Sequence, residues 1–93
     1  MKKEYMRARK DAVKATVRAY KRKPCQDCGN SYPYYVMDCD HRPDEEKLYQ
    51  VAQIHKNQHT LAKVQAELDK CDVICANCHR MRTYERGQYD AHN

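Results

Sequence analysis

The sequence of 93 residues contains no phenylalanine and no tryptophan. Its aromatic residues are eight tyrosines, and a buried tyrosine needs a hydrogen-bond partner for its hydroxyl group. A chain of this length also buries little apolar surface when it folds. A large apolar core is therefore excluded, and we expect a cross-link or a metal ion to stabilise the fold. We expect Tyr32, Tyr34 and Tyr35 to supply part of the small core.

Long apolar runs are also absent. No segment is apolar enough to cross a membrane, and the charged N-terminal residues lack the apolar stretch of a secretory signal peptide. We therefore expect a cytoplasmic protein with no membrane partner. Disulfide bonds are rare in that reducing compartment, so the six cysteines are expected to bind metal, and a disulfide framework is the alternative.

The spacing of the cysteines is typical of a metal site. Four of them form two C-x-x-C pairs, namely Cys25, Cys28, Cys75 and Cys78. Each pair brings two thiolates to one point, so two pairs can complete a tetrahedral structural zinc site. We expect the remaining two, Cys39 and Cys71, to be buried as small apolar side chains.

Charge is distributed unevenly along the chain. Residues 1–24 contain ten Lys or Arg and two acidic residues, a net charge of +8. Residues 25–93 contain eight basic and eleven acidic residues, a net charge of −3. A basic segment on a mildly acidic body indicates a polyanionic partner, and we expect nucleic acid.

Three helices and two strands are expected. Residues 3–22 lack glycine and proline and have apolar residues at helical spacing, which predicts a basic helix that Pro24 ends. Further helices are expected over residues 60–70, with Thr60 as N-cap, and over residues 76–86, ended by Gly87. A helical turn is expected within residues 44–59.

Residues 32–41 favour an extended conformation, and the strand at residues 71–75 is expected to pair with residues 35–39. The predicted fold is a small α+β domain in which a two-stranded hairpin has a helix inserted in its connection. We divide residues 1–93 into a basic arm at 1–24, a core at 25–86 and a loose tail at 87–93.

Three segments, taken in their order along the chain, resemble a known family. They are the C-x-x-C pair at residues 25–28, the MDCDHRP run at residues 37–43 and the KCDVICANCHRMRT run at residues 70–83. The family is that of the HNH endonucleases, which have a ββα-metal fold, and the last run is similar to a subgroup of small bacterial and phage members. The resemblance implies a cation-dependent enzyme of the bacterial or phage-infected cell that hydrolyses phosphodiester bonds in DNA. One metal centre cuts one strand, so we expect nicking by a monomer or weak dimer.

The resemblance also assigns roles to residues. His41 matches the general base that activates water, a task that suits imidazole. Asp40 and His79 match the ligands of a catalytic divalent cation such as Mg²⁺ or Mn²⁺. The four C-x-x-C cysteines match structural zinc ligands. Basic residues near the site are candidates for phosphate contacts, namely Lys47, Arg80 and Arg82.

We expect zinc binding to bring Asp40, His41 and His79 face to face between strand and helix. Successive strand residues point to opposite faces, so a bend is expected at Asp40 or His41. Lys70 occupies the position of the family's central asparagine, a departure from the pattern. Candidates to replace that asparagine are Asn77, Asn57, His55 and His59. Alternatively, His79 could bind zinc and Asp40 could cap a loop.

Two other functions are open alternatives. A zinc-binding nucleic-acid adaptor would need the cysteine pairs and the basic helix, but not Asp40, His41 and His79 together. A redox or zinc-sensing switch would use Cys39 and Cys71, whose thiols would then react while zinc stays bound. The three candidate catalytic residues favour the nuclease.

Overall fold

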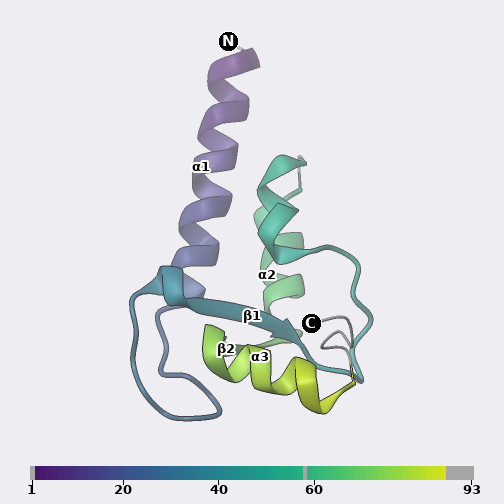
Figure 1. Ribbon diagram of the computed structural model, residues 1–93. Coiled ribbons are helices and arrows are strands. Elements are labelled where there is room, and N and C mark those ends of the chain that lie inside the picture. The colour runs from purple at the N-terminus through teal and green to yellow at the C-terminus, as the bar shows by residue number, and fades with distance from the viewer. Residues whose placement is uncertain (1, 58, 88–93) are drawn as a thin grey trace.

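The fold is built around an antiparallel hairpin, shown in the computed structural model of Figure 1, which describes residues 2–57 and 59–87. The elements, with η for a 3-10 helix, are α1 (Lys2–Tyr20), η1 (Tyr34–Val36), β1 (Met37–His41), η2 (Val51–Lys56), α2 (Leu61–Leu68), β2 (Cys71–Cys75) and α3 (Ala76–Glu85). Helices α1 and α2 lie side by side above the hairpin in this view, and α3 packs on its other side (Figure 1). The predicted small α+β architecture is confirmed. Of the predicted tail, residues 88–93 lie outside the described residues.

The two strands pair over their full length. The register runs from Met37 opposite Cys75 to His41 opposite Cys71. The observed β1 begins two residues after the predicted partner segment, because a 3-10 turn follows Pro33, in which the Val36 amide donates to the Pro33 carbonyl at 2.9 Å. Pairing continues to the last residue of β1, so the bend expected at Asp40 or His41 is absent from this strand.

Nearby residues explain where α2 begins and where α3 ends. The Thr60 hydroxyl oxygen accepts a hydrogen bond from the Lys63 amide at 3.2 Å, which confirms the predicted N-cap of α2. Gly87 follows α3 with a φ of +71°, a conformation that favours glycine and ends the helix as predicted. The helical turn expected within residues 44–59 is η2.

Two small clusters form the apolar core. The first lies between α1, η2, α2 and the hairpin, and consists of Val13, Val51, Ile54, Val64, Leu68 and Cys71. The second joins the hairpin to the cysteine pairs and α3, and consists of Cys25, Met37, Val73, Ile74, Cys75 and Cys78. Half of the second cluster is thus cysteine, and thiols take the place of the bulky apolar side chains that the sequence lacks.

The tyrosines contribute less to this core than predicted. Tyr35 is 74% exposed and Tyr32 is 38% exposed, so the prediction that these two fill the core is wrong. Tyr20 packs against both clusters instead. Tyr34 is half-buried, and the guanidinium carbon of Arg18 lies 5.1 Å from the centre of its ring.

Candidate functional site

The four cysteines of the two C-x-x-C pairs come together at one end of the hairpin. Their Sγ atoms all lie within 4.8 Å of one another, although the pairs are about 50 residues apart in sequence. Backbone amides support the thiols: the Cys75 amide donates to Cys25 Sγ at 3.3 Å, and the Cys78 amide donates to Cys75 Sγ at 3.5 Å. The cluster can therefore hold a metal ion such as zinc.

The thiols of this cluster differ in acidity. Burial alone would raise the pKa of Cys25, but amide hydrogen bonds from Cys28, Cys75 and Asp27 outweigh it and lower the pKa to about 6. Burial and the neighbouring thiols raise the pKa of Cys78 well above its usual range. Because thiolates are the ligands, a metal ion that binds here would displace thiol protons, that of Cys78 among them.

An acidic surface lies on the side of the hairpin that faces α3. Asp38 and Asp40 are two residues apart on β1, so their side chains point to the same face of the hairpin. Asp72 lies directly opposite Asp40 on β2. Asp40 is 6% exposed and is held by two arginines of the C-terminal segment. Arg82 Nη1 donates to its Oδ2 at 2.8 Å, and Arg86 donates to both of its oxygens at 2.8 and 3.0 Å.

Arg82 connects three acidic residues across this surface. Its Nε and Nη2 donate to the Asp27 carboxylate at 2.7 and 2.6 Å, and its Nη1 also donates to Asp72 at 3.0 Å. The hydrogen bond with Arg82 lowers the pKa of Asp27. Arg82 therefore ties the first cysteine pair to the hairpin and α3. This internal pairing differs from the phosphate contact predicted for it.

His79 lies beside two of the acidic residues. Its Nδ1 is 3.0 Å from Asp38 Oδ2, and its Nε2 is 3.7 Å from Asp40 Oδ1. The structure thus brings Asp40 and His79 together, as expected from the sequence. Within residues 2–57 and 59–87, however, only the four cysteines form a group of three or more potential ligands close enough to hold a metal.

His41 points to the opposite face of the hairpin. Because β1 is regular up to His41, its side chain faces α2 whereas that of Asp40 faces α3. Its Nε2 lies 2.7 Å from Oε2 of Glu67, which is 1% exposed. The expectation that Asp40, His41 and His79 face one another is therefore wrong for His41.

Glu67 is a buried carboxylate that the sequence analysis did not single out. It also accepts hydrogen bonds from Lys70 Nζ and the Leu48 amide, both at 3.2 Å. Burial would raise its pKa, but these bonds and the one to His41 outweigh burial and lower it. The sequence feature that could have identified Glu67 is its position between Val64 and Leu68, beside the apolar face of the predicted helix.

The other predicted residues make different contacts or are exposed. Lys70 precedes β2, where its Nζ donates to Glu67 and to the Glu46 carbonyl at 2.8 Å. His59 packs on the Tyr49 ring with 4.1 Å between ring centres. Several candidates are exposed side chains, namely Lys47, Asn57, Asn77 and Arg80.

The two remaining cysteines are in or beside the first core cluster. Cys71 is 4% exposed, which confirms its predicted burial, and Cys39 is partly buried against the same cluster. Burial raises the pKa of Cys71 to about 12 and also raises that of Cys39. Because the thiolate is the reactive form, these values disfavour the redox switch.

Acid should destabilise the fold through three carboxylates. The pKa values of Asp27, Asp40 and Glu67 are depressed below their ordinary values, 3.8 for aspartate and 4.5 for glutamate. Such groups contribute stability above the unfolded pKa and lose it as the pH falls through the folded pKa. We expect the urea midpoint to be steady from roughly pH 6 to 5 and to fall below about pH 4. A midpoint that is unchanged down to about pH 3, with zinc content measured in parallel, would contradict this account.

No described helix is both long enough and apolar enough to cross a bilayer. Comparisons with protein-family models, curated proteins and solved structures find no match to the chain.

Proposed function

We propose that this protein is a divalent-cation-dependent endonuclease that nicks DNA, with a ββα-metal core of the HNH type and a structural zinc site. The observation that carries the proposal is the approach of His79 to Asp40, next to the four-cysteine cluster. The histidine comes from α3, the carboxylate from β1, and Cys78 directly precedes His79. This is the combination that the resemblance to HNH endonucleases implies.

Asp40 and His79 are the residues that would hold the catalytic cation. Two ligand atoms on one ion, each about 2.0–2.2 Å from it, lie at most roughly 4.4 Å apart. The separation of 3.7 Å between His79 Nε2 and Asp40 Oδ1 is compatible with a shared ion. A bound cation would supply positive charge to the phosphate as negative charge builds on it.

His41 is the proposed base, and Glu67 is the residue that would orient it. With Nε2 held by the buried carboxylate, the ring can take a proton from water at Nδ1. His41 directly follows Asp40 and ends β1, so both groups lie at the same end of the hairpin although on opposite faces.

A second candidate function is a nucleic-acid adaptor without catalysis. The pairing of Asp40 with two arginines favours it, because Arg82 and Arg86 already neutralise the carboxylate that a cation would need. Such a protein would use its zinc site and basic α1 only to bind phosphates.

Conversion of supercoiled plasmid to the nicked form tests the proposed function. The zinc-loaded protein, dialysed free of other cations, should be inactive and should nick plasmid once Mg²⁺ or Mn²⁺ is added. Binding of the plasmid without nicking, under both cations, would favour the adaptor and refute the nuclease.

The role of Glu67 can be tested by removing its charge at nearly constant size. In Glu67→Gln the side-chain amide no longer holds the His41 ring as the carboxylate does, and we expect nicking to slow by about tenfold or more. Glu46→Gln removes an exposed carboxylate from the adjoining loop and should leave the rate unchanged. Glu67→Asp should recover part of the nicking rate if Glu67 acts by orienting the His41 ring. Equal rates for Glu67→Gln and wild type, at equal zinc content, would exclude this role.

A further inference from the structure

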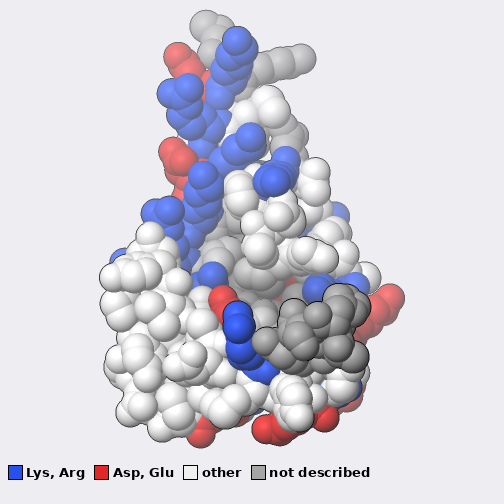
Figure 2. Space-filling model, in the orientation of Figure 1, with Lys and Arg blue, Asp and Glu red and all other residues white. Residues whose placement is uncertain are grey.

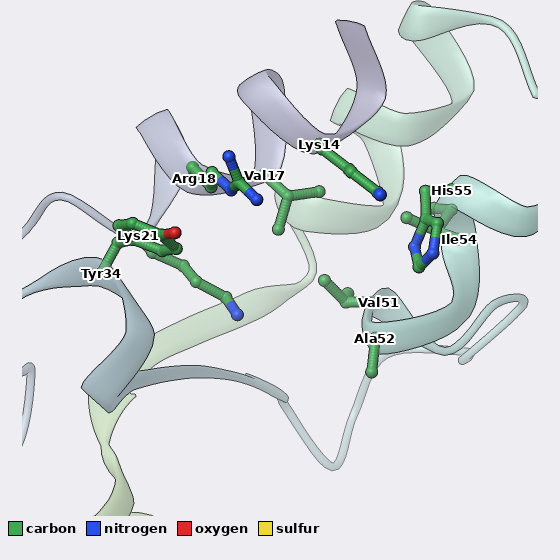
Figure 3. A pocket seen from close by; sticks show the side chains of 9 residues that line it. All are labelled: Lys14, Val17, Arg18, Lys21, Tyr34, Val51, Ala52, Ile54 and His55. Carbon is green, nitrogen blue, oxygen red and sulfur yellow. The ribbon is translucent and has the colours of Figure 1, made fainter. Parts of the chain in front are cut away.

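A pocket lies between α1 and η2, apart from the acidic surface and the cysteine cluster. It has a volume of about 140 Å³, and Figure 3 shows the side chains that line it. Lys14 and Arg18 extend from α1, and Lys21 follows the end of that helix (Figure 3). His55 of η2 lies opposite, and Val51 supplies part of the apolar lining.

The positive charge of this pocket is not neutralised within the described part of the chain. No carboxylate lines the pocket, and no described acidic residue pairs with Lys14, Arg18 or Lys21. Partial burial lowers the pKa of His55, and so do the charges of nearby lysines, Lys14 among them. The three cations thus face one small space without a counter-charge, which is the electrostatic requirement for an anion site.

The pocket belongs to a longer line of positive charge. Six basic residues at spacings of three or four lie on one side of α1 and its end, namely Lys3, Arg7, Lys10, Lys14, Arg18 and Lys21. Blue side chains follow α1 along its length in Figure 2, and the red carboxylates lie beside them. The 18 residue-to-residue steps from Lys3 to Lys21 span about 27 Å along a helix, or about eight base pairs of duplex DNA at 3.4 Å each.

We propose that the pocket between α1 and η2 binds one backbone phosphate of duplex DNA, and that the line of basic residues contacts the phosphates next to it. A linear array of cations matches a polymer with regularly repeated charge better than it matches a small ligand. The volume also fits one phosphate group, because pockets for larger ligands measure about 300–1,000 Å³. The inference rests on the proposed function only in taking DNA as the ligand.

Fluorescence anisotropy with a short labelled duplex, without divalent cation, tests the inference apart from catalysis. Removal of two phosphate contacts in Lys14→Ala/Lys21→Ala should weaken binding by at least about tenfold and reduce the slope of log K against log salt by about 2. Lys63→Ala removes an exposed cation of α2 outside the pocket and should change affinity by less than about twofold. Lys14 is exposed and Lys21 is half-buried, so we expect both variants to fold, and circular dichroism of each variant is to be measured beside the binding.

The outcomes show whether the pocket inference fails alone or together with the proposed function. If wild type binds and nicks DNA but Lys14→Ala/Lys21→Ala binds equally well, the pocket inference fails and the proposed function stands. If wild type does not bind DNA at all, both fail. Polyglutamate that competes as well as unlabelled duplex, at equal charge concentration, would indicate an acidic protein partner and overturn DNA as the occupant of the pocket.

Discussion

Loss of the zinc ion that we propose for the four-cysteine cluster is expected to unfold this protein. Structural zinc contributes about 10–16 kcal/mol in zinc-finger peptides, and a whole small domain is stable by only about 5–15 kcal/mol. Three of the four thiols also belong to the second core cluster. Cys75→Ser should therefore abolish stoichiometric zinc binding and the cooperative thermal transition, as measured by metal analysis and circular dichroism.

Cys39→Ser is the matched control for that experiment. Cys39 lies on β1 but outside the four-cysteine cluster. The variant therefore replaces a sulfur atom by oxygen, as Cys75→Ser does, without removing a proposed zinc ligand. The variant should bind one zinc and melt cooperatively, with a loss of stability of about 1–2 kcal/mol for a partly buried site. A Cys75→Ser protein that melts like Cys39→Ser would contradict a structural role for the metal.

Replacement of His79 should remove nicking while the fold survives. His79 is partly exposed on α3 and contacts Asp38 and Asp40, so its loss costs surface contacts but no core packing. If His79 and Asp40 share the catalytic cation, His79→Ala should nick at least about a hundredfold more slowly at any Mg²⁺ concentration. The measurement is the initial rate of plasmid nicking across a Mg²⁺ titration.

Met81→Ala is the control on the same helix. Met81 lies two residues further along α3 and is 54% exposed, so its truncation should leave the nicking rate unchanged. If His79→Ala reached the wild-type rate at high Mg²⁺, His79 would only strengthen cation binding and would not be essential. If it nicked normally at all concentrations, the proposed cation site would be wrong.

Features of the fold with local causes could be predicted from the sequence. The Thr60 side chain caps α2 through a hydrogen bond to a residue only three positions away. Gly87 ends α3 because glycine, which has no side chain, readily adopts the positive φ found there. The start of β1 could not be predicted, since Tyr35 and Val36 favour strands but fold into a turn after Pro33. The exposure of Tyr35 depends on which helix packs nearby, which the sequence pattern does not encode.

The candidate site could be predicted only where motif spacing sets the geometry. The cysteine cluster follows from the spacing of the two C-x-x-C pairs. His79 approaches Asp40 because His79 directly follows the second pair and β1 pairs with the strand before that pair. The partner of His41 could not be predicted, because Glu67 reaches it only if β1 stays regular and α2 packs on that face. The arginine pairs of Asp40 were missed for a similar reason, since they depend on the rotation of α3 relative to the hairpin.

His41 is the base that we propose for the DNA-nicking site. Plasmid nicking by zinc-loaded His41→Ala, with Mg²⁺ or Mn²⁺, is compared with nicking by wild type and by Met81→Ala, whose replaced side chain is exposed. We predict that wild type and Met81→Ala nick only with cation, and that His41→Ala is slower by about a hundredfold or more. Nicking that survives His41→Ala would place the base elsewhere and contradict the mechanism; plasmid left supercoiled by all three proteins would contradict the nuclease itself.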